Sequence, residues 1–168
     1  YSYNNPTDRL IDLDFVTYYT KSQADELRLD DLGAGAAGEL LKRDVDTIGT
    51  RLDNRSRFSP SEDVGLTFTY GSEYYRDEQD GAAGNGQRDG VPDAEADFLG
   101  VYVQSEVAIS DPFGGGTGDF LLIPGLRYDN YSTSSAIASE NSSDAISPRF
   151  GATYLPNDWL MLFGNYAH

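Results

Sequence analysis

The stretch FLGVYVQSEVAIS, from Phe98 to Ser110, changes character at every second residue. Side chains of a β-strand point to opposite faces in turn, so this period predicts one strand with two unlike faces. One face is aliphatic, and the other is small, polar or charged. The aliphatic set is Leu99, Val101, Val103, Val107 and Ile109, and the opposite set is Gly100, Tyr102, Gln104, Glu106 and Ser110. The question for function is which of the two faces meets water.

The same alternation predicts seven strands, each bounded by clusters of Gly, Pro, Asp, Asn or Ser. The predicted strands are Leu10–Thr20, Val45–Phe58, Val64–Arg76, Phe98–Ser110, Phe120–Asn130, Ile146–Leu155 and Trp159–Ala167. Most are longer than typical strands of soluble proteins and suit a tilted crossing of a bilayer. The stretch ELLKR at Glu39–Arg43 offers a short helical alternative.

The connectors between these strands alternate in length. Short, turn-like connectors are predicted at Phe58–Val64, Ser110–Asp119 and Leu155–Trp159, and long loops at Lys21–Asp44, Asp77–Asp97 and Tyr131–Asp144. In an antiparallel up-and-down sheet this alternation puts the short turns on one rim and the long loops on the other. Outer-membrane barrels show the same asymmetry.

The polar face of the predicted strands carries charges of both signs. These residues are Asp12, Asp14, Arg51, Asp53, Arg55, Arg57, Glu73, Glu106, Arg127 and Arg149. A soluble β-sandwich would turn this face to water, whereas a membrane barrel would turn it to its lumen and the aliphatic face to lipid. Periodicity alone leaves both environments open.

Aromatic residues near the strand ends favour the barrel, because such rings concentrate at membrane interfaces. They are Tyr18, Tyr19, Tyr70, Tyr74, Tyr75, Tyr128, Tyr131, Tyr154 and Trp159.

The composition is that of a β-rich chain, with 18 Gly, 12 Tyr and 8 Phe among 168 residues and no Cys to form a disulfide. A formal charge of −16 without any Lys/Arg run argues against a nucleic-acid partner. No apolar stretch is long enough for a transmembrane helix. The chain begins without a signal peptide and stops inside an apolar run, so we expect a piece of a longer protein.

The sequence contains few of the residue combinations that catalysis requires. His168 is the sole imidazole, which leaves no Ser-His-Asp triad and no zinc cluster. The glycine run Gly114–Gly116 lacks a following Lys-Ser/Thr, so it predicts a turn rather than a phosphate loop. The paired carboxylates Asp12 and Asp14 suit acid-base work, but arginines on the same face are their expected partners. We therefore expect no enzyme activity.

The acidic stretch DEQDGAAGNGQRDGVPDAEAD, Asp77–Asp97, offers oxygen ligands for a hard cation such as calcium. The candidate ligands are Asp89, Asp93 and Asp97, although their spacing does not match an EF-hand. The alternative interpretation is a solvated loop without a metal.

Five stretches resemble successive barrel strands of TonB-dependent outer-membrane receptors, with the closest likeness to the haem/haemoglobin receptor branch. They are IGTRLDNRSRF (Ile48–Phe58), LTFTYGSEYYRDEQDG (Leu66–Gly81), GVYVQSEVAI (Gly100–Ile109), LIPGLRYDNY (Leu122–Tyr131) and SPRFGATYLPNDWLMLFGNYA (Ser147–Ala167). The resemblance covers nearly the whole chain. It indicates the architecture more specifically than the ligand.

The resemblance implies an all-β, antiparallel up-and-down transmembrane barrel of about 22 strands, closed by a plug domain. Residues 1–168 would supply about seven of these strands, with the plug and the C-terminal strands absent. The ten charged residues named above would line the lumen and contact the plug. The family's haem-ligating histidines lie in segments outside this chain, so His168 is not assigned as a ligand.

The resemblance further implies energy-coupled uptake across the outer membrane of a Gram-negative bacterium. The partners would be outer-membrane lipid, the receptor's own plug, the TonB energy-coupling complex, and haem, a haemoprotein or a siderophore. No bound cofactor is implied, because haem or a ferric complex would be the transported ligand. Two other hypotheses remain: a soluble or surface β-sandwich whose acidic loops bind calcium or glycans, and a passive porin-like channel.

Overall fold

The computed structural model describes residues 1–31, 36–84, 86–87 and 91–168, and all the regular structure in these ranges is β-strand. The strands are β1 (Ser2–Asn4), β2 (Asp12–Leu27), β3 (Leu40–Ser61), β4 (Val64–Ala83), β5 (Gly86–Gln87), β6 (Ala94–Ser110), β7 (Asp119–Ser135), β8 (Ala138–Asn157) and β9 (Leu160–Ala167). In the described part of the chain, no helix is long and apolar enough to cross a membrane.

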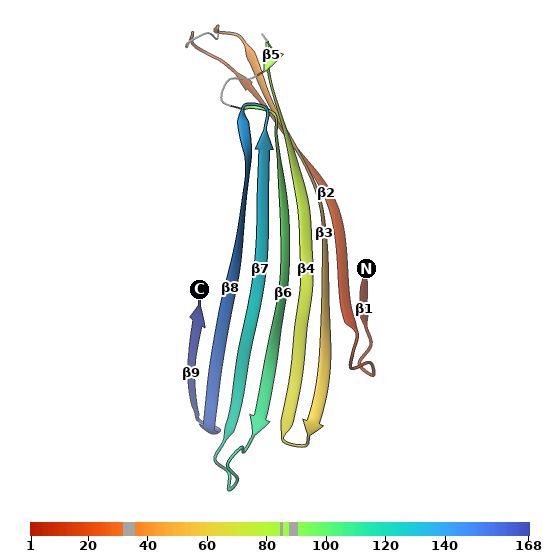
Figure 1. Cartoon of the computed structure of the whole chain (residues 1–168), viewed down its shortest axis with the longest axis vertical. Helices are drawn as coiled ribbons and strands as arrows, with labels where there is room; N and C mark the ends of the chain where they lie inside the picture. The colour runs from red at the N-terminus through yellow and green to blue at the C-terminus, as the bar shows by residue number, and fades with distance from the viewer. Residues whose placement is uncertain (32–35, 85, 88–90) are drawn as a thin grey trace.

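The strands form one antiparallel sheet in which neighbours along the chain are neighbours in space. Its order is β1-β2-β3-β4-β6-β7-β8-β9, and the short β5 pairs with the end of β4 outside this path. Figure 1 shows the resulting up-and-down meander, with the N-terminus at one edge and the C-terminus at the other. The predicted all-β, antiparallel up-and-down fold is confirmed.

All seven predicted strands are present, and most extend well beyond their predicted ends. The stretch predicted as a helical alternative, Glu39–Arg43, lies at the start of β3 and forms strand from Leu40. The predicted long loop Tyr131–Asp144 is wrong, because β7 and β8 pair almost to their tips and leave only Ala136 and Ile137 between them. Backbone hydrogen bonds continue the ladder there whatever the polarity of the side chains. The short turns do share one rim (Figure 1).

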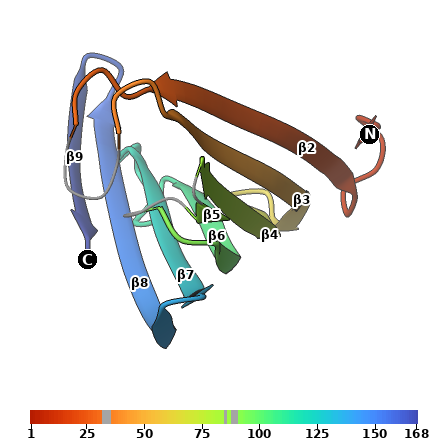
Figure 2. The ribbon, with the colours of Figure 1, turned by 90° about the horizontal axis from the view of Figure 1, so that it is seen from above.

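In the part of the chain that the structure describes, the sheet is a single curved layer with no second layer packed on it (Figure 2). Among the described residues, Leu41 is the one buried hydrophobic side chain, and it is still 9% exposed. Large apolar side chains such as Val103, Leu126 and Ile146 lie open on one face. Strand pairing therefore holds the described part of the chain together, and its large apolar side chains stay exposed on one face.

The register assigns the two faces without ambiguity, because residues opposite each other in paired strands share a face. One face contains the row Tyr70, Val103 and Leu126, and the adjacent row Leu52, Val101, Tyr128 and Ile146; we name it the apolar face. The other contains Tyr102, Gln104 and Arg127 and is named the charged face. The alternation predicted for Phe98–Ser110 is thus continued across the whole sheet.

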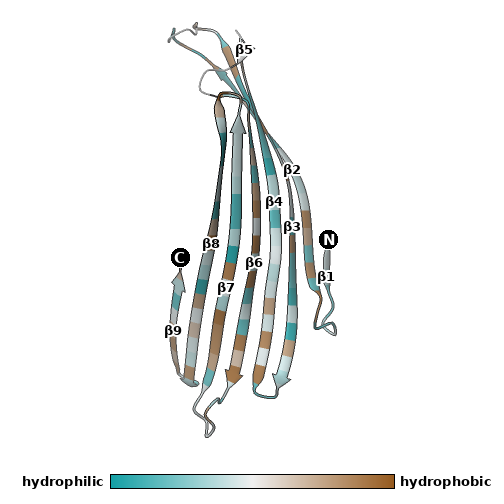
Figure 3. Cartoon of the chain, in the orientation of Figure 1, coloured by the Kyte–Doolittle hydropathy of each residue, from teal (hydrophilic) through white to brown (hydrophobic). Residues whose placement is uncertain are grey.

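On the apolar face, large apolar side chains concentrate in a band next to the short turns, where Figure 3 shows many of its brown segments. Leu27 and Leu40 lie beyond this band, near the long-loop rim. On β4 this band runs from Val64 to Tyr74. Ten steps of about 3.4 Å make roughly 34 Å of strand, and a tilt of about 40° reduces its height to about 26 Å. That height matches the apolar band of about 25 Å on transmembrane barrels.

Aromatic rings mark both edges of the band. At the short-turn edge, Phe120 stacks on Tyr154 with ring centroids 4.4 Å apart, and the Tyr154 hydroxyl donates to the Thr117 carbonyl at 2.6 Å. At the opposite edge, the Tyr74 hydroxyl donates to Asp97 at 2.6 Å. Rings with an apolar body and a polar tip fit the boundary between lipid and water.

Candidate functional site

All ten charged residues predicted as site residues lie on the charged face. The register places Arg51 opposite Glu73, Asp14 opposite Asp53, and Arg127 opposite Tyr102. Arg55 and Arg149 share one row that runs through Thr69, Gln104 and Gly125. The alternation along each strand also places the remaining three on this face, because each lies an even number of residues from a charged-face neighbour on its own strand. They are Asp12, Arg57 and Glu106.

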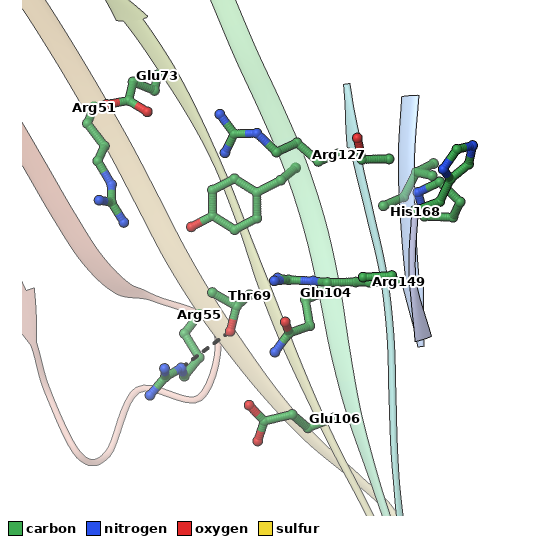
Figure 4. A pocket seen from close by; sticks show the side chains of 14 residues that line it. Arg51, Arg55, Thr69, Glu73, Gln104, Glu106, Arg127, Arg149 and His168 are labelled. Atoms are coloured by element: carbon green, nitrogen blue, oxygen red, sulfur yellow. Dashed lines mark hydrogen bonds between the residues drawn. The ribbon is translucent and has the colours of Figure 1, made fainter. Parts of the chain in front are cut away.

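Six of these side chains line one open hollow of about 500 Å³, which we name the charged hollow (Figure 4). They come from five different strands, so the hollow exists only because the sheet pairs in this register. Tyr102, Gln104 and Thr69 supply further polar groups. The six are Arg51, Arg55, Glu73, Glu106, Arg127 and Arg149. Asp12, Asp14 and Asp53 line a smaller hollow of about 210 Å³ toward β1.

Three of the arginines are held by carboxylates. Arg51 binds Asp53 at 2.5 Å, Arg57 binds Asp12 at 2.5 Å, and Arg127 binds Asp129 at 2.8 Å. Exposed ion pairs of this kind contribute about 0–1 kcal/mol each, so they orient the side chains more than they stabilise the sheet. The sequence-based list missed Asp129, although it has the same parity as Arg127.

Arg55 and Arg149 have no carboxylate partner among the described residues. Arg55 donates a long hydrogen bond of 3.4 Å to Thr69. Arg149 lies across Gly125, where an added Cβ would come within 2.7 Å of the Arg149 Nε, and its guanidinium points toward Gln104 (Figure 4). These two cations share a row and face open space, which makes them available to an outside anion.

Tyr102 also belongs to the site and was not among the predicted site residues. Its hydroxyl donates to Asp53, two strands away. Gly71 lies between them in the same row, and a Cβ there would come within 2.4 Å of the Asp53 Oδ1. The Tyr–Gly–Asp row is therefore possible only with glycine in the middle. The sequence alone could not identify this row, because recognising it requires the register of β3, β4 and β6.

The aromatic residues divide between the two faces. Tyr19, Tyr70, Tyr74, Tyr128 and Tyr154 lie on the apolar face, as the interface interpretation requires, and Trp159 lies exposed in the β8–β9 turn. For the remaining three the interpretation is wrong. Tyr18, Tyr75 and Tyr131 lie on the charged face, because their neighbours Gly49, Phe98 and Ser143 have that parity.

Charged pairs begin immediately beyond the apolar band on the long-loop side. Arg76 donates to both carboxylate oxygens of Asp97, at 2.9 Å each. The Arg76 guanidinium, and after it the Tyr74 hydroxyl, lowers the pKa of Asp97 below its usual value. A similar trio lies further out, where Tyr19 and Lys21 both donate to Asp46 and lower its pKa.

The described residues do not form the calcium site that was considered from the sequence. Asp97 is occupied by Arg76, and Asp93 accepts a hydrogen bond from the Gly81 amide at 3.2 Å. Asp89 lies outside the described residues. Within the described ranges, no group of three or more His, Cys, Asp or Glu side chains is placed to hold a metal. His168 lines the charged hollow, and its backbone amide donates to the Pro148 carbonyl at 3.1 Å.

The sequence profile of the family described as TonB dependent receptor-like, beta-barrel matches residues 1–168. The "Hemin receptor" of Yersinia pestis is 34% identical over 125 residues, which is 74% of this chain and 17% of that protein. The "Hemin receptor" of Yersinia enterocolitica is 34% identical over 121 residues, 72% of this chain and 16% of that protein. The chain therefore spans about one sixth of the length of these relatives.

Proposed function

The chain belongs to the TonB-dependent receptor β-barrel family, and from this premise we propose that it forms part of the wall of an outer-membrane receptor for energy-coupled uptake of haem or another iron complex. In this proposal the apolar face meets outer-membrane lipid and the charged face meets the lumen. The plug and the remaining strands come from the rest of the protein.

The observation that carries the proposal is the apolar band with nothing packed on it. In the described chain, side chains such as Val101, Val103 and Leu126 are 40–48% exposed on a face whose height suits a bilayer. A soluble sandwich would need a second sheet over this face. The family membership favours a plugged receptor over a passive porin.

The charged face suits contact with a plug domain that must move. Its ion pairs are exposed to a hydrated lumen, where each contributes about 0–1 kcal/mol. Many weak ion pairs and hydrogen bonds would together fix the position of the plug. Water could replace each of them when the TonB complex pulls on the plug. Arg55 and Arg149, which have no carboxylate within the described chain, would take their partners from the plug.

Haem is favoured over other iron complexes because both similar relatives carry the name hemin receptor. Within the described residues, no group of three or more His, Cys, Asp or Glu side chains is placed to hold a metal ion. Because the family's haem-ligating histidines lie in other segments of the receptor, this part of the wall would guide and enclose the ligand rather than coordinate its metal.

The test uses the full-length receptor in a Gram-negative host. We expect it to require detergent for extraction from the outer membrane, to bind haem in the purified state, and to support growth on haem as iron source only when TonB is present. A protein soluble without detergent would overturn the barrel assignment. Binding of a ferric siderophore but not of haem would overturn the ligand assignment alone, and uptake without TonB would overturn the energy coupling.

A further inference from the structure

Four aromatic side chains form one row across the charged face. The register pairs Tyr18 with Gly49, Gly49 with Tyr75, Tyr75 with Phe98, and Phe98 with Tyr131. The row crosses β2, β3, β4, β6 and β7, which at about 4.8 Å per strand is roughly 19 Å wide. We name Tyr18, Tyr75, Phe98 and Tyr131 the aromatic row.

Tyr18, Tyr75 and Phe98 of the aromatic row each contact a neighbouring group on the charged face. Tyr75 and Phe98 stack with centroids 4.9 Å apart and planes 18° from parallel. Tyr18 leans over Gly49, where its ring atoms lie 2.3–2.6 Å from the place of a Cβ, so the glycine lets the ring cover β3. The Arg127 guanidinium lies 5.9 Å from the centre of the Phe98 ring.

The aromatic row separates two hollows on the same face. Below it lies the charged hollow of about 500 Å³. Above it, toward the long-loop rim, lies a hollow of about 290 Å³ lined by Asp77, Ala96, Thr133 and Tyr131 itself. A ligand that moves along this face from the long-loop rim to the charged hollow crosses these rings.

Membrane contact does not account for the aromatic row, because its rings share a face with Arg51 and Arg127 rather than with Val101. Tyr131 keeps 43% of its surface exposed. An exposed aromatic surface among charges is typical of binding sites, where a ring offers a flat apolar partner. The occupant should therefore be flat, apolar on its faces and anionic at its edge.

We propose that the aromatic row is a stacking platform for the haem macrocycle on its way through the lumen; this rests on the haem assignment of the proposed function. Because Tyr75 and Phe98 stack on each other, the conjugated ring lies across the edges of this pair, in edge-to-face contact with both rings. Its carboxylates point toward Arg51, one row below, and Arg127, two rows below. The platform binds the organic ring and does not ligate iron.

The experiment measures haem binding by the purified full-length receptor carrying Tyr75→Ala with Phe98→Ala. We expect haem affinity to fall about tenfold or more, because the edge-to-face contacts with both rings are lost. Tyr74→Ala with Leu99→Ala is the matched control, since these residues pair in the next row on the apolar face, and should leave haem affinity unchanged. Heat-modified mobility on gels confirms that every variant is folded.

Two further measurements separate stacking from iron ligation. Tyr75→Phe keeps the ring and removes the phenol, and we expect haem affinity within twofold of the parent. Metal-free protoporphyrin IX should lose affinity in the double alanine variant by about the same factor as haem. The platform would be overturned if Tyr75→Phe lost haem binding. It would also be overturned if protoporphyrin bound the double alanine variant as tightly as the parent.

The outcomes distinguish this inference from the proposed function. If the parent binds haem and the folded double variant binds it equally well, the platform is wrong while the haem receptor assignment stands. If the double variant loses its plug, seen as new protease cleavage with unchanged haem affinity, the row packs on protein and the platform is likewise wrong. If the parent binds no haem, the ligand assignment and the platform both fall.

Discussion

The hydroxyl of Tyr102 on β6 donates a hydrogen bond to Asp53 on β3, across the strand that separates them. Such a contact requires that both side chains lie on the same face and that nothing stands between them. The register and Gly71 satisfy the two conditions. The hydrogen bond therefore depends on the register of β3, β4 and β6, and it shows that the face on which it lies is polar.

Substituting Gly71 with alanine should disrupt this row. The added methyl carbon would lie 2.4 Å from the Asp53 Oδ1 and 2.5 Å from the Leu52 carbonyl oxygen, so side chain and backbone must both shift. We expect the unfolding free energy of the full-length receptor to fall by about 1–3 kcal/mol. Gly65→Ala is the matched control on the same strand and face, because its Cβ would meet only Ala108 at 3.9 Å. Equal stability of the two variants in urea titrations would contradict the packing described here.

Arginine substitutions at adjacent positions should distinguish the two faces. Val103→Arg places a charge in the middle of the apolar band, where it costs about 2–4 kcal/mol in a transmembrane barrel. Gln104→Arg places the same side chain on the charged face, where repulsion from Arg55 and Arg149 in a hydrated hollow should cost about 1 kcal/mol or less. Folding into lipid vesicles, followed by gel mobility and urea titration, measures both. If Gln104→Arg is the more destabilising change, the faces are assigned the wrong way round.

Reversing the charge of Arg149 should weaken the contact between barrel and plug. Arg149 has no carboxylate partner among the described residues, so the loss cannot be attributed to a broken ion pair within this part of the wall. We expect Arg149→Glu to expose the plug of the full-length receptor to added protease and to lower TonB-dependent uptake severalfold. Arg149→Lys keeps the charge and should retain most of both. Identical behaviour of the parent and Arg149→Glu would remove Arg149 from the plug-contacting set.

The β6–β7 turn should lose its order at acid pH. Asp111 has φ +43° and accepts hydrogen bonds from the amides of Gly116 (2.9 Å) and Thr117 (2.7 Å) and from the Thr117 hydroxyl (2.8 Å). The Gly116 amide, followed by the Thr117 groups, lowers the pKa of Asp111 below its usual value of about 3.9. Because the folded-state pKa is the lower one, the stabilisation is complete above about pH 4 and is lost as the pH falls through that pKa.

Amide hydrogen exchange checks this prediction. After correction for the intrinsic pH dependence, protection of Gly116 and Thr117 should be constant from pH 7 to about pH 4 and fall below it. Asp111→Asn tolerates the positive φ and carries no titrating carboxylate, so its protection should be lower and independent of pH in this range. An unchanged acid response in Asp111→Asn would show that another group controls the turn.

The faces of the sheet were predictable from sequence because alternation is a local property. Val101 and Tyr102 are assigned to opposite faces by their positions alone, and the ten charged residues follow in the same way. Strand ends were predicted too early. Beyond the apolar band both faces are polar, so residues such as Ser132 and Ser142 lose the alternating signal while their backbones still pair.

Contacts across strands were not predictable, because they depend on register. The Tyr102–Asp53 hydrogen bond, the Arg127–Asp129 pair and the aromatic row each join residues through strands whose alignment the sequence does not state. Tyr75 shows the consequence. Its position near a strand end suggested the membrane interface, whereas pairing with Phe98 places it on the charged face.

The most direct test of the central claim, that the charged face is the interior, is spin-label accessibility along β6 of the full-length receptor in lipid vesicles. This chain has no Cys, so single cysteines at Val101, Tyr102, Val103 and Gln104 can be labelled once any others in the receptor are replaced. We predict high oxygen accessibility at positions 101 and 103, and low oxygen accessibility at 102 and 104, where a polar paramagnetic reagent would gain access instead. The reversed alternation, or polar-reagent access at all four positions, would contradict a lipid-facing apolar band and with it the barrel-wall account.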